Sequence, residues 1–364
     1  MARHSDSIRL LLAKGPMLAR QVVENTGLSQ PTVSRALAAM GDEIVRIGSG
    51  SAIRYALRDS ARGFALAPIF RVSDEGQVQA LGTLVPVRPE GFVIVQDDGP
   101  ALHSDGLPWW LFDMRPQGYL GRAYASAHAA SLGLPPNPEH WRDADVIRAL
   151  LAHGHDAIGN LLIGERARDR FIAMPAPVPV DRAVDYPALA RAAGAGELPG
   201  SSAGGEQPKF CAYTERGHVL VKFTAADDNP VSERWRDLLL AEHLALSVLG
   251  IETEVFDFGP QRFLEVPRFD RIGPLGRPYQ LAPAYDMLPM AFAPSRSGAL
   301  IDTLPPALLS SAVDAGAWHE ALQRAERFHA LLMDCRGFSG RFLPCIGAIR
   351  RHIDEAGARI GRLG

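Results

Sequence analysis

The chain contains few of the residues that define disulfide-rich, metal-binding or membrane proteins. Only three cysteines occur among 364 residues, namely Cys211, Cys335 and Cys345. Their number and spacing match neither a disulfide framework nor a zinc motif. No apolar run approaches the ~18 residues of a membrane-spanning helix, and the apolar patch near the N-terminus is too short for a signal peptide. We therefore expect a cytoplasmic protein with no membrane span.

A large excess of charge is also missing. The formal net charge is −3, which argues against a chain coated in nucleic acid but allows a local basic face. The hydrophobic fraction of 47% supplies a core, and 364 residues predict two or three domains. Lysine is scarce, because arginine supplies nearly all of the 38 basic residues. The lysines at positions 14, 209 and 222 are therefore more informative than usual.

The first 58 residues predict three helices followed by two strands. "SDSIRLLLAKGP", "MLARQVVENTG" and "LSQPTVSRALAAMGD" have helical periodicity. Gly27 suits the end of the second helix, Ser29 suits the cap of the third, and Pro31 suits its first turn. "EIVRIGSGSAIRYAL" predicts two strands around a Gly-Ser turn. This order is typical of a winged helix-turn-helix.

The third helix of this module has the composition of a DNA-reading helix. "LSQPTVSRAL" resembles the recognition helix of many bacterial repressors, and residues 1–58 carry eight Lys or Arg against four Asp or Glu. Small polar side chains can reach base edges, while arginines contact phosphates. The candidate DNA-binding residues are Ser29, Gln30, Thr32, Ser34, Arg35 and Arg54. The alternative is a winged helix used only for protein contacts.

Residues 62–180 show a different pattern. "VQALGTLVPVRPEGFVIVQDD" predicts β-structure, and the segment around Trp109 and Trp110 predicts turns leading into a helix, with both indoles packed in a core or lid. "HGHDAIGNLLIGE" contains Asp156 and Asn160 in an order that superficially resembles a kinase catalytic loop. Their spacing is one residue short, and the segment precedes the candidate ATP lysine. We therefore expect a turn between strands there.

A second pattern runs through residues 200–290. "GSSAGGEQPKFCAY" is a small-residue loop leading into a strand, and "HVLVKF" is an alternating strand that carries Lys222. "SERWRDLLLAEHLALSVLG" predicts an amphipathic helix that carries Glu242, "RFLEVPRFDR" predicts a strand, and Asp286 follows another in "YQLAPAYDMLP". Loop, strand lysine, helix glutamate and late aspartate come in the order of a protein-kinase ATP site. Taken singly, each residue could equally be an ordinary surface charge.

The whole chain resembles the HipA-like kinases of toxin-antitoxin systems, in the branch with an N-terminal helix-turn-helix. The matching text is "SSAGGEQPKF", "VLVKF", "FLEVPRFDR", "LAPAYDMLP", "LPWWLFDMRPQGYLGR" and "GNLLIGE". The resemblance implies an α+β serine/threonine protein kinase with its own DNA-binding module. Its implied domains are a winged helix-turn-helix (1–58), a β-rich HipA-type N-terminal subdomain (62–180), a kinase N-lobe-like part (181–272) and a shortened helical C-lobe (273–364).

The resemblance also implies a set of site residues and cofactors. It implies that Lys222 contacts ATP phosphates, that Glu242 orients this lysine, and that Asp286 binds Mg²⁺. Ser202 matches a loop serine that is autophosphorylated in some members, and a phosphate there would disfavour ATP binding. The full implied ATP site consists of Ser202, Gly204, Gly205, Lys209, Lys222, Glu242 and Phe269.

The chain departs from this family at the catalytic loop. Members carry Asn-x-Asp-x-His-x-x-Asn between the "FDR" strand and the late aspartate, but here only fourteen residues, 272–285, separate Arg271 from Asp286. They contain no aspartate or asparagine, so no catalytic base is identified. Pro267 also replaces a usual glutamate. The simplest interpretation is an internal deletion of tens of residues.

Two hypotheses follow from the sequence. The first is an ATP- and Mg²⁺-dependent HipA-like kinase acting on a protein substrate, impaired by the missing loop. The second is a DNA-binding transcriptional regulator whose kinase-like part is a pseudokinase or a nucleotide-sensing scaffold. An unrelated small-molecule enzyme lacks support, because the sequence has no metal spacing, nucleophile elbow or dinucleotide fingerprint.

Overall fold

The computed structural model contains helices and three antiparallel sheets, which confirms the predicted α+β class. It describes residues 2–73, 76–97, 99–157, 159–195, 207–267, 284, 286–295 and 297–363. The described residues form two compact units, the first unit up to Ala176 and the second unit from Pro177 onward, each with its own hydrophobic core. None of the described helices is long and apolar enough to cross a membrane.

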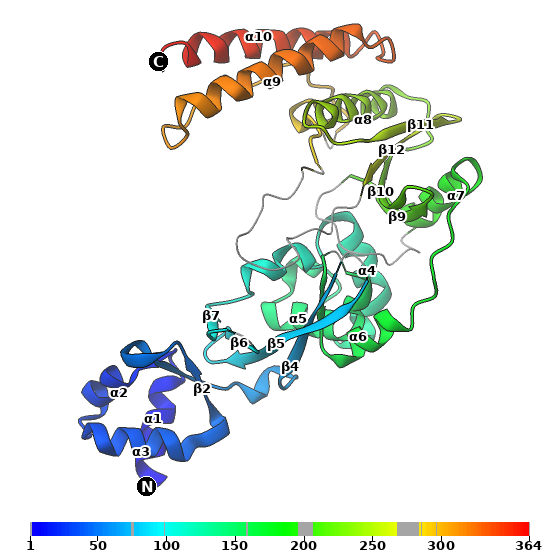
Figure 1. Ribbon diagram of the computed structural model, residues 1–364. Coiled ribbons are helices and arrows are strands. Elements are labelled where there is room, and N and C mark those ends of the chain that lie inside the picture. The colour runs from blue at the N-terminus through cyan, green and yellow to red at the C-terminus, as the bar shows by residue number, and fades with distance from the viewer. Residues whose placement is uncertain are drawn as a thin grey trace. The chain divides into compact units, whose positions relative to one another are not determined.

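The N-terminal part of the first unit holds three helices and a sheet with the strand order β1-β3-β2. The elements are α1 (Ala2–Leu12), β1 (Met17–Leu18), α2 (Ala19–Thr26), α3 (Gln30–Met40), β2 (Ile44–Ile47) and β3 (Arg54–Leu57) (Figure 1). Gly27 ends α2 with φ of +67°, a left-handed conformation that suits glycine. Pro31 lies in the first turn of α3. The helices and the strand pair expected over 1–58 are confirmed.

Two details of this region differ from the sequence expectation. The predicted second helix begins late, because Met17 and Leu18 form a short strand that pairs with β3. Ser29 occupies the N-cap position of α3, but its side chain makes no capping bond to the backbone. Its hydroxyl lies instead 2.9 Å from Oγ1 of Thr32. Pairing with β3 explains the late start of the helix, and the contact with Thr32 explains why the Ser29 hydroxyl does not cap α3.

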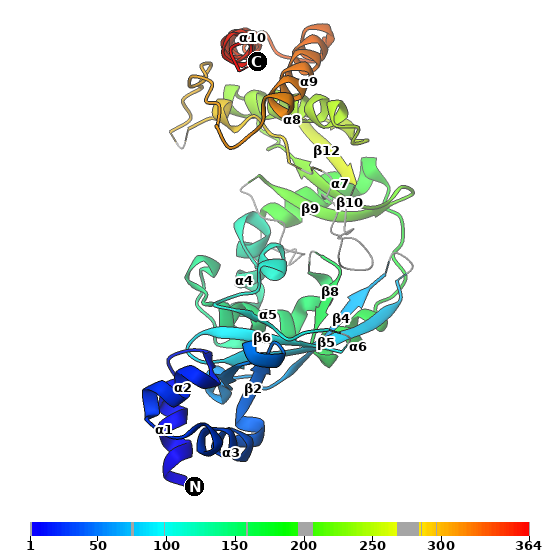
Figure 2. The same cartoon turned by 60° about the vertical axis from the view of Figure 1, so that its left-hand side comes forward.

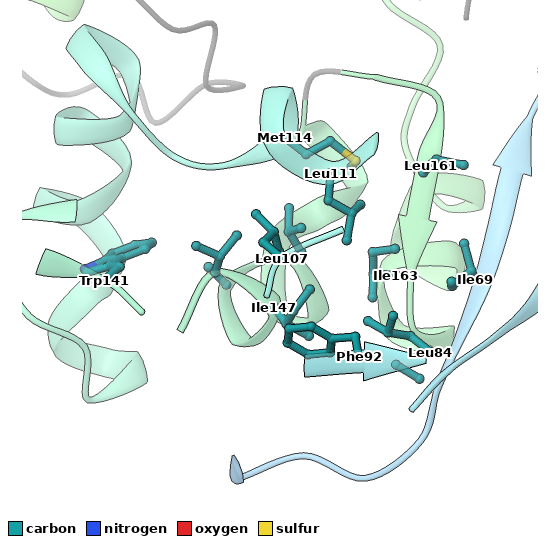
Figure 3. Packing of buried hydrophobic residues seen from close by; sticks show 14 of the residues in the cluster. Ile69, Leu84, Phe92, Leu107, Leu111, Met114, Trp141, Ile147, Leu161 and Ile163 are labelled. Atoms are coloured by element: carbon teal, nitrogen blue, oxygen red, sulfur yellow. The ribbon is translucent and has the colours of Figure 1, made fainter. Parts of the chain in front are cut away.

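The rest of the first unit is a five-stranded antiparallel sheet with three helices. The strands are β4 (Ala67–Val72), β5 (Val78–Val87), β6 (Gly91–Gln96), β7 (Leu102–Ser104) and β8 (Leu161–Ile163), in the order β7-β6-β5-β4-β8. The helices are α4 (Gly118–Leu132), α5 (Asp143–His153) and α6 (Glu165–Ile172). Figure 3 shows the core between strands and helices, where Leu84, Phe92, Ile147 and Ile163 are buried. The predicted β-structure is confirmed.

The tryptophan pair and the His-Asp segment both differ from expectation. Trp109 is 61% exposed, so the prediction that its indole packs in a core or lid was wrong. Trp110 packs against the core as predicted. The His-Asp segment forms a short 3₁₀ turn, Gly154–Asp156, that follows α5 and precedes β8. It is a turn as predicted, but it joins a helix to a strand. The other 3₁₀ turns are Gly41–Glu43, Gly50–Ala52, Ser60–Arg62, Trp109–Met114, Pro138–His140 and Met290–Phe292.

The second unit is built on a four-stranded antiparallel sheet with the order β11-β12-β10-β9. Its elements are α7 (Arg182–Gly194), β9 (Lys209–Thr214), β10 (Gly217–Phe223), α8 (Pro230–Val248), β11 (Glu254–Phe258), β12 (Gln261–Pro267), α9 (Ala315–Asp334) and α10 (Leu343–Ile360) (Figure 2). Asn229 caps α8 by accepting a hydrogen bond from the Ser232 amide at 2.9 Å, and Pro230 opens the helix. The strands and helices expected for the described segments are confirmed, whereas the strand expected before Asp286 falls outside the described residues.

The two faces of the β9–β12 sheet carry different side chains. Successive residues of a strand point to opposite faces, so Val221 and Lys222 of β10 face opposite sides. Lys222 reaches α8, and its direct neighbour on β9 is Lys209. Val221 lies opposite Glu265 of β12, on the face that α7 covers. Lys222 and Lys209 therefore lie on the face that α8 covers, and Val221 and Glu265 lie on the face that α7 covers.

Candidate functional site

Lys222 is a fully buried cation at the centre of the sheet. Its side chain is only 2% exposed, and its Nζ donates to Oε1 of Glu242 at 2.5 Å and to Oδ1 of Asp286 at 2.9 Å. Strand alternation explains this position, because valine and leucine neighbours hold β10 in the middle of the sheet while Lys222 faces α8. The structure thus joins three predicted site residues from a strand, a helix and a later loop.

Glu242 is a buried carboxyl that is only partly satisfied. It has no exposed surface, and its Oε1 accepts hydrogen bonds from Lys222 and from the Met287 amide at 3.0 Å. Its Oε2 has no hydrogen-bond partner among the described residues. Burial raises the pKa of Glu242, and the Lys222 ammonium opposes this shift. A buried acceptor without a hydrogen-bond partner destabilises the folded state. Glu242 can therefore still accept a hydrogen bond from another donor or bind a proton.

Asp286 is the exposed member of the group. Its side chain is 52% exposed, in contrast to the enclosed Lys222 and Glu242. Burial acts to raise the pKa of Asp286, but the adjacent Lys222 ammonium, with hydrogen bonds from Glu242 and the Leu288 backbone, lowers it below the ordinary value. Asp286 is therefore a carboxylate at neutral pH that solvent or a ligand can reach.

Lys209 places a second cation beside Lys222. The two residues are direct cross-strand partners on β9 and β10, and Lys209 is 2% exposed. Burial lowers the pKa of Lys209 to about 8, and the charge of Lys222 adds to this effect. Like charges on adjacent strands repel each other, so the pair favours an anion nearby. Two lysines and one accessible carboxylate suit phosphate oxygens with a divalent cation.

Gln207 is a neighbour that sequence reasoning did not single out. It is 9% exposed, its Nε2 donates to the Phe223 carbonyl at 3.0 Å, and its Oε1 is buried without a partner among the described residues. Gln207 thereby fixes the start of β9 to the end of β10, next to both lysines. Its place in "GGEQPKF", two residues before Lys209, was the available signal.

Four predicted ATP-site residues lie outside the described part of the chain. They are Ser202, Gly204, Gly205 and Phe269. Their proposed contacts with phosphate and adenine stay predictions. Among the described residues, no group of three or more His, Cys, Asp or Glu side chains could hold a metal ion by itself.

The candidate DNA-binding residues gather around α3 and β3. Ser29, Gln30, Ser34 and Arg35 are exposed at or near the start of α3, while Thr32 is half-buried. The opposite side of α3 supplies Val33, Ala36, Leu37 and Met40 to the core. Arg54 is exposed at the start of β3. The structure thus separates an apolar inner face of α3 from a polar outer face, and DNA contact by that face stays a prediction.

Two comparisons relate the chain to known proteins. The profile of the YjjJ-like toxin middle domain matches residues 65–172, which contain the five-stranded sheet. A protein of Escherichia coli strain K12 named Toxin YjjJ is 32% identical over 437 aligned positions, covering 97% of this chain and 98% of the relative. The alignment is 73 positions longer than the 364-residue chain, so at least that many positions of the relative face gaps here.

Proposed function

The chain belongs to the YjjJ-like toxin family, and from this premise we propose that it is a toxin-type protein whose second unit binds a purine nucleotide with Mg²⁺ in a HipA-like kinase arrangement. One observation carries the proposal. Lys222 Nζ lies within hydrogen-bond distance of Glu242 on α8 and of Asp286 on the later loop. A strand lysine held by a helix glutamate is the group that grips nucleotide phosphates in protein kinases.

The exposed side of this group supports nucleotide binding. Lys222 and Glu242 are enclosed, whereas Asp286 is half-exposed, so a ligand would approach from the Asp286 side. A phosphate oxygen could take the place of Asp286 on Nζ, which would leave that carboxylate to a cation. Lys209 would add a second positive charge, and phosphate would favour its protonated form.

The donor set suits Mg²⁺ only together with phosphate. Mg²⁺ in nucleotide sites is commonly bound by one or two carboxylates plus substrate phosphates. The described residues offer Asp286 but no cluster of three acidic or histidine ligands. We therefore propose that Asp286 and nucleotide phosphates bind Mg²⁺ jointly, and that the metal neutralises phosphate charge there.

We propose that phosphoryl transfer is impaired. The fourteen residues between Arg271 and Asp286 contain no aspartate to accept the proton of a substrate hydroxyl. The loss of general-base assistance typically costs ~10²–10⁴-fold in rate. The longer alignment with the E. coli relative supports a deletion, since at least 73 of its positions have no counterpart here.

Calorimetric titration of the full chain with ATP tests nucleotide binding. Wild type should bind ATP more tightly with Mg²⁺ than without it. Lys222→Ala should lose at least tenfold in affinity, and Asp286→Ala should lose mainly the Mg²⁺ effect. Lys14→Ala, a change to an exposed lysine in the turn that follows α1, is the matched control. Absence of ATP binding by the folded wild type would contradict the proposal.

Radiolabelled ATP tests the impairment separately. We expect no more than trace labelling of the chain, including Ser202, and no transfer to proteins of a cell extract. Rapid stoichiometric autophosphorylation would show that another residue replaces the missing base.

Expression in a bacterial host tests toxicity. Growth inhibition that Lys222→Ala abolishes would connect the toxicity to the nucleotide site. A protein substrate and an antitoxin partner can then be sought by comparing the wild-type chain with the Lys222→Ala variant.

The second candidate function is transcriptional regulation through a winged helix-turn-helix in residues 1–58. The exposed polar face of α3, with Arg35 on it and Arg54 on the wing strand, favours this function. A gel-shift assay on the chain's own promoter should show sequence preference and affinity that falls steeply with salt. Arg35→Ala should weaken binding, whereas Arg191→Ala, an exposed arginine on α7, should not. Binding without any preference would argue for a module used in protein contacts.

A further inference from the structure

A cavity of about 540 Å³ lies in the first unit, where the N-terminal helices and the β7-β6-β5-β4-β8 sheet meet. One wall comes from α1 and the 3₁₀ turn Gly41–Glu43, through Arg9, Asp42 and Glu43. The opposite wall comes from β5, through Val85 and Pro86. This volume falls within the range of small-molecule sites, about 300–1,000 Å³.

The floor of the cavity is the segment that connects β3 to the rest of the first unit. Its backbone is bonded on both sides: the Arg58 amide donates to the Glu43 carbonyl at 2.8 Å, and the Asp59 amide donates to the Pro86 carbonyl at 2.9 Å. The Arg88 amide donates to the Leu57 carbonyl at 2.9 Å. The cavity is therefore bounded by backbone that is fixed to both walls.

Two of the three arginines that line the cavity are paired, and within the described residues Arg58 and Asp42 make no ion pair. Arg9 pairs with Glu43 at 2.8 Å, and Arg88 pairs with Asp59 at 3.1 Å. Within the described residues, the Arg58 guanidinium makes no ion pair, and its Nε is buried without a hydrogen-bond partner. Because Nε itself is enclosed, a ligand in the cavity would meet the rest of the guanidinium of this half-buried residue, which has no carboxylate partner among the described residues.

We propose that this cavity binds a small organic monocarboxylate, with its carboxylate on Arg58 and its apolar body against Phe64, Leu66, Val85 and Pro86. Guanidinium and carboxylate match each other in a two-bonded planar geometry. The apolar lining covers the remainder of the ligand, as in most small-molecule sites. No other site described above uses these residues.

The charge balance favours a monoanion over a phosphate ester. Three carboxylates, Asp42, Glu43 and Asp59, line the same cavity, and the other two arginines already compensate two of them. The lining holds three arginines and three carboxylates, so a monocarboxylate on Arg58 adds one negative charge to a balanced set. A phosphate dianion adds two negative charges to the same set and is therefore disfavoured more strongly.

Saturation-transfer NMR with the full chain tests the site directly, with benzoate and hexanoate as probes. Benzyl alcohol and hexanol are the uncharged matches, and inorganic phosphate is the polar anion. We expect both carboxylates to bind, and the alcohols and phosphate to bind at least about tenfold more weakly, as one charge-assisted pair implies. Equal binding of alcohols, or tighter binding of phosphate, would overturn the proposal.

Two variants locate the binding. Arg58→Gln should weaken benzoate at least about tenfold, whereas Arg46→Gln, an exposed arginine on β2 outside the cavity, should not change it. Leu66→Trp should fill the cavity and block binding with Arg58 intact; Leu66 is 48% exposed, so this change spares the core. Benzoate binding that survives in folded Leu66→Trp would place the ligand elsewhere. DNA and nucleotide are absent from this assay, so its result does not depend on the function proposed above.

Discussion

The two faces of the β9–β12 sheet each hold a buried glutamate, and the two glutamates have opposite surroundings. Glu265, on the α7 face, accepts from Nε of Arg182 at 2.5 Å, from Nη2 of Arg182 at 3.2 Å and from the Tyr186 hydroxyl. Glu242, on the α8 face, uses one oxygen for Lys222 and leaves the other without a partner among the described residues. The first carboxylate is saturated from within, and the second is not.

This difference separates a structural contact from a candidate site. Arg182 and Tyr186 attach α7 to the sheet, and the Tyr186 ring packs against Phe210 and Phe263 with centroids 5.4 Å and 5.6 Å away. Nothing remains there for a ligand to bind. The Glu242 group ends instead in a half-exposed carboxylate and an unused acceptor. The two buried ion pairs thus differ in whether the surrounding residues use the full hydrogen-bonding capacity of the glutamate.

The largest effect is expected from Glu265→Ala. It would leave Arg182 and the Tyr186 hydroxyl without their shared acceptor, and breaking a buried pair in this way costs about 3–5 kcal/mol. Hydrogen exchange of the β10 and β12 amides would measure the loss of stability. Glu215→Ala is the matched control, because Glu215 also pairs with Arg182 at 2.5 Å but is 65% exposed. It should cost less than ~1 kcal/mol. Similar costs for both variants would contradict the comparison.

The next effect concerns Lys209 and is a pH dependence. Burial lowers the pKa of Lys209 to about 8 from its ordinary value of 10.5, so the unfolded chain binds more protons than the folded one between these values. This group should therefore add stability as pH rises from 8 to 10.5, on the order of 2–3 kcal/mol in the second unit. The gain should vanish in Lys209→Met and persist in Lys14→Met. Denaturant titrations across this range would measure it, and an unchanged slope in Lys209→Met would refute the assignment.

A smaller effect is expected from Lys222→Met, about 1–3 kcal/mol at pH 7. The substitution removes the cation that opposes the raised pKa of Glu242, so this pKa should rise further. An acid whose folded pKa is raised loses stability as pH rises, so the deficit relative to wild type should shrink when the pH falls from 7 to 5. Urea unfolding at both pH values would measure the deficit. A deficit that stays the same at both pH values would mean that Glu242 gains no proton over this range.

The smallest effect is expected from Glu242→Gln. The amide keeps the shape of the carboxyl and its acceptor for Lys222, and Lys222 retains Asp286, so the cost should stay within about 1 kcal/mol. Glu265→Gln replaces a saturated carboxylate by the same amide and should cost about 1.5–3 kcal/mol. Hydrogen exchange on the two variants side by side compares the faces directly. Equal costs would mean that both clusters serve the fold alone.

Local patterns were enough to predict most of the elements. The alternation in "HVLVKF" predicts β10, and the glycine at position 27 predicts the end of α2. Details that depend on a distant partner escaped prediction, because β1 exists only through its pairing with β3. Trp109 escaped for the same reason, since only the packed structure decides which of two adjacent indoles is covered.

The candidate site was predictable in part. The sequence pattern placed Lys222, Glu242 and Asp286 in the order of a protein-kinase ATP site, and the structure brings the three side chains together. The Glu265 cluster was not predictable, because Arg182 lies 83 residues away and nothing local marks the pair. The cavity beside Arg58 also escaped, since its walls come from segments with no shared motif.

Val221 and Lys222 are adjacent in sequence yet belong to environments on opposite sides of one sheet. A one-residue insertion between the start of β10 and Val221 would shift the strand register and exchange every side chain between the faces. Lysine would then point toward Tyr186 and its aromatic neighbours, and valine toward Glu242. Evolution of this strand is therefore restricted to substitutions and to insertions of two residues, which preserve the alternation of faces.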